Sequence, residues 1–386
     1  MKNFLNKNKG TLIAVGVVLV VGLILAIAII ISTTERVEKY VLSQDNLIQY
    51  NGVDENIVID DKVISIGQSV FASKTSITKV TFEKKSKLSS IGHSAFEGCL
   101  ALKEITLPST LKSIGYGAFK NCASLESIVI PEGVTSIEGH AFDGCIKLKS
   151  ITLPSTLTTL GEGVFDGCDA LEVINSSSAA IKVENGVLFN GTTLVKVLPG
   201  TQPTEYTVPS FVTRIDAYAF EYTESITKLV VGTNVEYIGN AAFIGCKAIA
   251  EIALPFVGRG DADGEGPKGF EAGLLCSLFS DSISAAPSTL VKVEVLGGKV
   301  LCADAFRNCR NIKEIILPNT LEVIEINAFQ NCSKLTSIVI PESVKEINGF
   351  AFVGCTSLYI KVKCDASAVK DFAFSTIAED RIEYLK

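Results

Sequence analysis

Eleven cysteines are the residues of this 386-residue chain with the most obvious chemical potential. Eight of them close copies of one phrase, Ala-Phe-x-Gly/Asn-Cys, or a near variant: Cys99, Cys122, Cys145, Cys168, Cys246, Cys309, Cys332 and Cys355. Copies stacked like neighbouring strands would lie about 4.8 Å apart, inside the Cα separation of roughly 4.4–6.8 Å found in disulfides. Parallel side chains in such a stack point the same way, however, so the disulfide dihedral is hard to reach. We therefore expect a buried ladder of free thiols that pack as small apolar groups.

Three cysteines, Cys276, Cys302 and Cys364, lie off this ladder, and any disulfide is expected to involve them. A zinc site is disfavoured because the chain contains no Cys-x-x-Cys pair.

The two histidines, His93 and His140, fall in variable turn positions, where we expect surface residues. Two histidines are too few for a His-rich metal site, and no Ser-His-Asp arrangement is indicated.

One polar segment contains alternating carboxylates that could bind a cation. Asp261, Asp263 and Glu265 alternate, and Gly266 stands sixth, as in the first half of a calcium loop. Ala272 stands where the closing acid is expected, so we interpret the segment as a solvated polar loop, with calcium as the alternative.

The net charge of −7 and the lack of a Lys/Arg-rich run disfavour a nucleic-acid partner. We expect no enzyme, no cofactor, no metal and no small-molecule substrate.

The repeated phrase also predicts the fold. Phe96, Phe119 and Phe142 are 23 residues apart, and further copies follow at Phe165, Phe220, Phe243, Phe306, Phe329, Phe352 and Phe374. A fixed period of this length is typical of a solenoid, in which each coil buries its apolar face only against its neighbours. We predict a β-rich solenoid of about a dozen 23-residue coils with short parallel strands.

Each part of the unit has a physical role. Leu102, Ile105 and Leu107 end in strict alternation, which indicates a short strand with one buried face. Pro108 ends that strand because it lacks a backbone N–H for the ladder. We expect Gly115 to supply a tight turn.

Two intervals break the period. From Phe165 to Phe220 is 55 residues, and from Phe243 to Phe306 is 63, so we expect atypical segments at about 176–210 and 255–300. In the first segment, Asn185-Gly186 and Asn190-Gly191 are turn dipeptides between alternating apolar residues. They predict a β-hairpin that projects from the stack or is spliced into it.

The N-terminal part has the pattern of a membrane anchor. Residues 11–31 form an apolar run without a charge, and at about 1.5 Å per residue they would span the roughly 30 Å of a bilayer core. A cleaved signal peptide is the alternative, although a polar start after a small-residue site is missing. Three lysines precede the run, so we expect residues 1–10 in the cytoplasm. A juxtamembrane stalk at 32–56 and an extracellular solenoid at 57–386 complete the predicted organisation.

The repeat unit resembles that of the BspA-like leucine-rich repeat family. The resemblance rests on Ala-Phe-x-Gly/Asn-Cys-x-x-Leu-x-x-Ile-x-Leu-Pro-x-x-Leu-x-x-Ile-Gly, and it extends over about 57–386. Both atypical segments are similar to interruptions found in that family. The resemblance implies a surface-exposed binding role, for example adhesion to a host or matrix protein, and it assigns no partner to particular residues.

Outward strand positions are the candidate binding surface. Strict alternation assigns to it Glu104, Thr106, Ser127, Val129, Ser150, Thr152, Val173, Asn175, Lys228, Val230, Glu251, Ala253, Lys292, Glu294, Glu314, Ile316, Ser337 and Val339. The loop residues Arg259, Asp261 and Asp263 join the candidates because the second atypical segment departs most from the pattern. Strand propensity alone could also account for the Thr and Val residues.

We expect a cell-surface protein for protein–protein interaction or adhesion; a self-associating envelope or spacer protein is the alternative.

Overall fold

The computed structural model describes residues 39–257, 275–279 and 286–385. The chain divides into two compact units, one of residues 1–41 and 50–52 and the other of residues 42–49 and 53–386. The second unit is a stack of β coils, which confirms the predicted solenoid. Among the described residues no helix has the length and apolar character needed to cross a membrane. The predicted transmembrane run at 11–31 lies outside the described residues.

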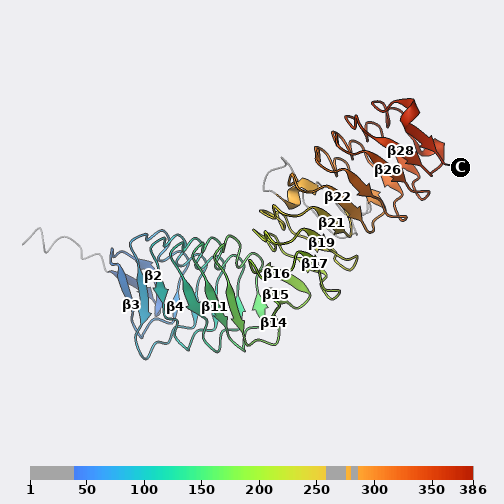
Figure 1. The fold of residues 1–386 in the computed structure, drawn as a ribbon. Coiled ribbons are helices and arrows are strands. Elements are labelled where there is room, and N and C mark those ends of the chain that lie inside the picture. Colours follow the sequence, from blue (N-terminus) through green and yellow to red (C-terminus); the bar gives the residue numbers. More distant parts are fainter. Residues whose placement is uncertain (1–38, 258–274, 280–285, 386) are drawn as a thin grey trace, which may run out of the picture. The chain divides into compact units, whose positions relative to one another are not determined.

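Each coil contributes one strand, here called a face strand, to a row of parallel pairings (Figure 1). The described part contains fourteen face strands: β3 (Asn56–Ile59), β5 (Lys79–Phe82), β7 (Glu104–Ile105), β9 (Ser127–Val129), β11 (Ser150–Leu153), β13 (Val173–Ser176), β17 (Glu205–Thr207), β19 (Lys228–Val230), β21 (Glu251–Leu254), β22 (Lys292–Val295), β24 (Glu314–Ile316), β26 (Ser337–Ile340), β28 (Tyr359–Val362) and β29 (Ile382–Tyr384). They slightly exceed the predicted dozen, within almost the same bounds as the predicted 57–386.

A second row of short strands, here called return strands, lies on another side of each coil. It consists of β4 (Ser65–Ile66), β6 (Ser90–Ile91), β8 (Ser113–Ile114), β10 (Ser136–Ile137), β12 (Thr159–Leu160), β18 (Arg214–Ile215), β20 (Tyr237–Ile238), β23 (Val300–Leu301), β25 (Val323–Ile324) and β27 (Glu346–Ile347). Tight turns separate the two rows: after Pro108 ends the face-strand segment, its carbonyl accepts a hydrogen bond from the Leu111 N–H at 3.1 Å. The described residues also contain three short 3-10 helices, η1 (Leu275–Leu278), η2 (Ala366–Ala368) and η3 (Glu379–Arg381).

Stacked side chains fill the interior. Phe96 and Phe119 lie with ring centroids 5.3 Å apart and planes 2° from parallel, and Phe119 and Phe142 repeat this at 5.5 Å and 4°. The backbone of this turn is also paired between coils, since the Phe119 N–H donates to the Ala141 carbonyl at 2.8 Å. The repeated phenylalanine is therefore held by ring stacking and by a backbone hydrogen bond to the next coil.

Gly115 is required for a different reason from the one we predicted. Its φ is not positive, but a Cβ there would lie 2.8 Å from the Gly92 backbone and 2.9 Å from the His93 nitrogen. Gly115 therefore permits close approach of two coils. The left-handed turn falls two residues later, where Gly117 has φ +59°.

The first atypical segment is spliced into the stack as a three-stranded meander. Strands β14 (Ile181–Glu184), β15 (Val187–Asn190) and β16 (Thr193–Val197) pair antiparallel, and β16 then pairs parallel with return strand β18. Asn185 and Gly186 have φ of +50° and +73°, as a two-residue hairpin turn requires. The predicted hairpin is confirmed, and the second dipeptide adds a third strand.

The second atypical segment leaves the face row in register. Strands β21 and β22 pair parallel, with Glu251 opposite Lys292 and Leu254 opposite Val295, although about forty residues separate them. Between them, η1 supplies buried Leu275 and Leu278 to the core. The irregular part is thus narrower than the predicted 255–300, because β22 and the start of β23 already belong to regular coils.

The predicted stalk at 32–56 overlaps regular structure. Strands β1 (Tyr40–Ser43) and β2 (Asn46–Tyr50) lie within it, and β2 pairs with return strand β4 through Leu47 and Ile66. These residues lack the Ala-Phe-x-x-Cys phrase, so the repeat motif alone did not indicate them.

Candidate interaction surface

The face strands orient the predicted residues as alternation requires. Ile128 of β9 is buried, whereas its neighbours Ser127 and Val129 are exposed, and the same alternation holds around Ile315 of β24. Glu104, Thr106, Lys228, Glu314 and Ile316 are also exposed, and Ser150, Thr152 and Val230 are half-buried. Ala253 is the exception at 8% exposure, because its small side chain lies between the larger Val230 and Glu294 on neighbouring strands.

Three adjacent coils form an uncharged band. The register places Ser127, Ser150 and Val173 in one column, and Val129, Thr152 and Asn175 in the next. Val129 is 64% exposed and Val173 is 45% exposed. A flat surface of hydroxyl, amide and β-branched groups can accept hydrogen bonds and apolar contacts from a partner without desolvating a charge.

Later coils form a charged band in which acids and bases alternate. Glu205, Lys228, Glu251, Lys292 and Glu314 occupy one column in register. Lys228 lies 3.7 Å from Glu205, and Lys292 lies 3.6 Å from Glu314. A shallow depression of about 50 Å³ lies between these side chains over β19, β21 and β22. The column therefore holds three acids and two bases, and both lysines are in ion pairs.

The two bands belong to separate sheets. In the described residues β13 ends one sheet and β17 begins the next, with the meander between them. Glu104 lies on β7, in a third sheet with β3 and β5, so the predicted positions do not form one uninterrupted platform. Arg259, Asp261 and Asp263 lie outside the described residues.

The cysteine ladder is buried, as predicted. All eight ladder thiols are reduced and at most 2% exposed. Seven of them donate to the carbonyl of a phenylalanine in the preceding coil, as Cys122 does to Phe96 at 3.3 Å and Cys145 to Phe119 at 3.2 Å. Burial raises the pKa of the Cys99 thiol to about 12. A thiol that is buried and protonated in this way is an unreactive packing group.

The two histidines make ordinary turn contacts. His93 Nε2 lies 3.1 Å from a Glu138 oxygen at an exposed position. His140 Nδ1 lies 3.1 Å from Asp143 Oδ2 and 3.8 Å from Asp166 Oδ2. His140 thus contacts carboxylates of its own and the neighbouring coil, whereas His93 reaches a carboxylate two coils along.

A buried ion pair between the meander and the following coil was missed by sequence reasoning. Lys196 Nζ lies 2.9 Å from Glu221 Oε2, and both side chains are less than a tenth exposed. The same Glu221 oxygen accepts the Gly167 N–H at 3.0 Å from a coil 54 residues away. Elsewhere this N–H donates to a backbone carbonyl of the next coil, as Gly144 does to Asp166. One feature of the sequence could have indicated this ion pair: Lys196 is the one charged residue among the apolar residues of 194–198.

Three carboxylates, from Asp60, Asp61 and Glu83, bring oxygens within 4.8 Å of one another. Asp60 and Glu83 are exposed, and exposed acidic groups commonly cluster without an ion. Their geometry alone therefore assigns no metal.

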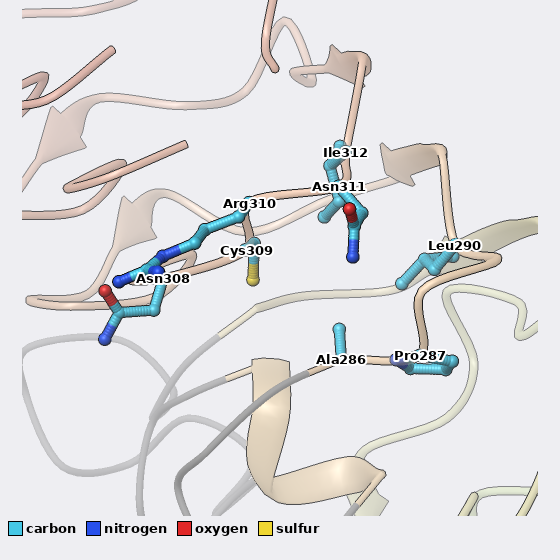
Figure 2. A pocket seen from close by; sticks show the side chains of 8 residues that line it. All are labelled: Ala286, Pro287, Leu290, Asn308, Cys309, Arg310, Asn311 and Ile312. Atoms are coloured by element: carbon cyan, nitrogen blue, oxygen red, sulfur yellow. The ribbon is translucent and has the colours of Figure 1, made fainter. Parts of the chain in front are cut away.

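Two larger cavities flank the atypical segments. One of about 350 Å³ lies beside the meander, lined by Lys182, Phe189 and Phe211 among others. The other, of about 290 Å³, lies between Ala286–Leu290 and the turn 308–312 (Figure 2). Both are small openings at coil junctions.

Comparison with known proteins agrees with the geometry. The sequence profile described as the BspA-type leucine-rich repeat region matches residues 43–172, 198–257 and 299–382 in six copies. No curated protein matches the chain.

Several solved structures share the fold. A leucine-rich repeat protein from Eubacterium ventriosum is 24% identical with a TM-score of 0.58, covering 80% of this chain and 88% of its own. A leucine-rich cell surface protein from Faecalibacterium prausnitzii is 22% identical with a TM-score of 0.51, covering 88% and 95%. The pneumococcal vaccine antigen PcpA is 19% identical with a TM-score of 0.55, covering 86% and 78%. The profile covers well over half of the residues, so this chain belongs to the BspA-type leucine-rich repeat family.

Proposed function

We propose that this chain is a membrane-anchored cell-surface protein that binds a protein partner through its face strands. The observation that carries the proposal is the preserved register of β21 and β22 across the long insertion. An insertion that is excluded from the face row keeps a surface of ordered, outward side chains intact. Repeat solenoids use such surfaces to bind proteins.

The uncharged band is the part of this surface that we assign to partner contact. Its exposed valines and hydroxyl groups can be covered without breaking ion pairs, whereas covering the charged band would desolvate paired charges. A surface role is also in keeping with the similar Faecalibacterium prausnitzii protein, which is described as a leucine-rich cell surface protein.

A pair of variants tests the assignment. In a fragment of residues 39–386, Val129→Glu with Thr152→Glu places two charges on the uncharged band. Thr135→Glu with Thr158→Glu is the control, because these threonines are exposed on the return side of the same coils. Binding to immobilised extracellular matrix proteins and to host cells should fall at least tenfold for the face variant only. Equal loss in the control, or no binding by the unaltered fragment, would contradict the proposal.

The proposed topology has its own test. We propose that residues 11–31 span the membrane, with residues 1–10 in the cytoplasm and the solenoid outside. Protease treatment of intact cells should remove the solenoid and leave the anchor. A protected solenoid would reverse the orientation and remove the surface role.

Self-association is the second candidate, and one observation favours it. Phe350 and Phe372 are 44% and 66% exposed near the end of the solenoid, and their rings stack at 5.7 Å. Exposed aromatic pairs of this kind are frequent in protein interfaces. Light scattering that shows a concentration-dependent increase in mass, lost on Phe372→Asn, would support this function. A monomer at all concentrations would exclude it.

A further inference from the structure

Two cysteine sulfurs approach each other where the second atypical segment meets the following coil. Cys276 Sγ lies 3.7 Å from Cys309 Sγ, and both residues are at most 2% exposed. Cys276 is on the 3-10 helix η1, whereas Cys309 is in the repeated turn after Phe306. The two residues are 33 positions apart in the chain.

Cys309 differs from the other ladder thiols in its hydrogen-bond partners, although Cys332 and Cys355 also share a thiol–thiol hydrogen bond. The other seven ladder thiols each donate to a phenylalanine carbonyl, at the positions Cys99, Cys122, Cys145, Cys168, Cys246, Cys332 and Cys355. Cys309 instead meets another sulfur, because η1 replaces the regular turn of the preceding coil. Cys276 also lies 3.9 Å from the Arg307 carbonyl, which is a weaker contact. The helix therefore brings a sulfur to Cys309 from a direction that the parallel ladder does not provide.

A cavity gives small molecules a route to the Cys309 side of this pair. Cys309 lines the opening of about 290 Å³ together with Ala286, Pro287 and Leu290. Figure 2 shows the Cys309 sulfur directed into the space between its own turn and Ala286. This volume is roughly that of several water molecules at about 30 Å³ each, so a molecule of similar size can enter.

The electrostatics of the pair favour one thiolate. A hydrogen bond from the Cys309 thiol lowers the pKa of Cys276 to about 7. The same contact and burial raise the pKa of Cys309 well above its ordinary value. The two sulfurs therefore share one proton, and the sulfur that lacks it is the nucleophile of the pair.

We propose that Cys276 and Cys309 form a peroxide-sensitive disulfide that fastens the η1 segment to the following coil. The thiolate of the pair attacks one oxygen of hydrogen peroxide, which breaks the O–O bond, gives a sulfenic acid and releases hydroxide. The second thiol then attacks the sulfenic sulfur, forms the S–S bond and releases the oxygen as water. Each disulfide oxidises two thiols, reduces one peroxide and yields two waters after the released proton neutralises the hydroxide. The sulfurs must close from 3.7 Å to about 2.05 Å.

Peptide mapping of the full-length protein tests this pairing. The reduced protein is treated with increasing hydrogen peroxide, free thiols are alkylated under denaturing conditions, and the chain is digested with trypsin without reduction. Cys276 and Cys309 are the single cysteines of the tryptic peptides 269–292 and 308–310. A linked 269–292/308–310 peptide should appear first and disappear with dithiothreitol, while alkylated cysteines fall from eleven to nine. The melting temperature should rise on oxidation and return on reduction.

Two controls make the result decisive. Cys276→Ala should give no linked peptide and no shift in melting temperature with peroxide. Cys145 and Cys168 are neighbouring ladder thiols that each donate to a carbonyl, and they should not link peptides 121–147 and 150–182. Absence of the 269–292/308–310 link, or equal linking of the Cys145 and Cys168 peptides, would overturn the proposal. The mapping of the unaltered protein stands even if the variant does not fold.

Discussion

Glycines in the repeat serve two distinct purposes that single substitutions can separate. Gly115 allows close approach of the preceding coil, whereas Gly117 adopts a left-handed backbone with its nearest contacts at 3.5 Å or more. We expect Gly117→Ala to cost about 1–2 kcal/mol from backbone strain alone. Gly115→Ala should cost more, because an added Cβ would force two hydrogen-bonded coils apart. Urea unfolding of the two variants checks the order, and an equal or smaller loss for Gly115→Ala would contradict it.

Asp166 should make stability depend on pH. Burial raises the pKa of its carboxyl to about 7, against an ordinary value of 3.8. Its charged neighbours are Lys196, Asp143, Glu221 and Asp216, with His140 3.8 Å away. At a pH between these two pKa values, the Asp166 carboxyl of the folded chain keeps a proton that the same carboxyl of the unfolded chain has released. The free energy of unfolding should therefore fall as pH rises from about 4 to about 7, and level off above that.

The variant Asp166→Asn isolates this contribution, since the amide cannot ionise. Urea unfolding at pH 5 and pH 7.5 should show a smaller difference for Asp166→Asn than for the unaltered protein. Glu126→Gln, at an exposed position, serves as the control and should leave the difference unchanged. An unchanged pH dependence in Asp166→Asn would show that other groups are responsible.

At the scale of elements, the meander is held to the coils around it by the Lys196–Glu221 pair. Removing one member of a buried pair leaves an uncompensated charge and costs about 3–5 kcal/mol. We expect Lys196→Met to lose that much stability. Lys196→Met with Glu221→Gln should recover most of the loss, because the glutamine carbonyl can still accept the Gly167 N–H. Circular dichroism melts check this, and a double variant as unstable as the single one would refute it.

At the scale of the whole molecule, local repetition made most of the fold predictable. The spacing of Phe and Cys predicted the stacked interior, and Asn185-Gly186 predicted its turn, because both depend on residues close in sequence. The contact of Gly167 with Glu221 was not predictable in this way, since it joins coils on either side of the meander. The strands at 40–50 were missed because they lack the repeated phrase. The separation of the two bands likewise depends on how the meander enters the stack.

Modularity is the property of the whole array that is most open to test. Coils pair in register at 23-residue steps, as Ser113, Ser136 and Thr159 do. Removal of residues 119–141 joins Ala118 to Phe142 and restores the repeated phrase one coil shorter. We expect this variant to fold with the same β content per residue and a modestly lower melting temperature, because each coil contacts only its neighbours. Removal of residues 119–130 shifts every later coil by half a period and should abolish cooperative folding. If both deletions melt alike, the stack does not behave as a sum of coils.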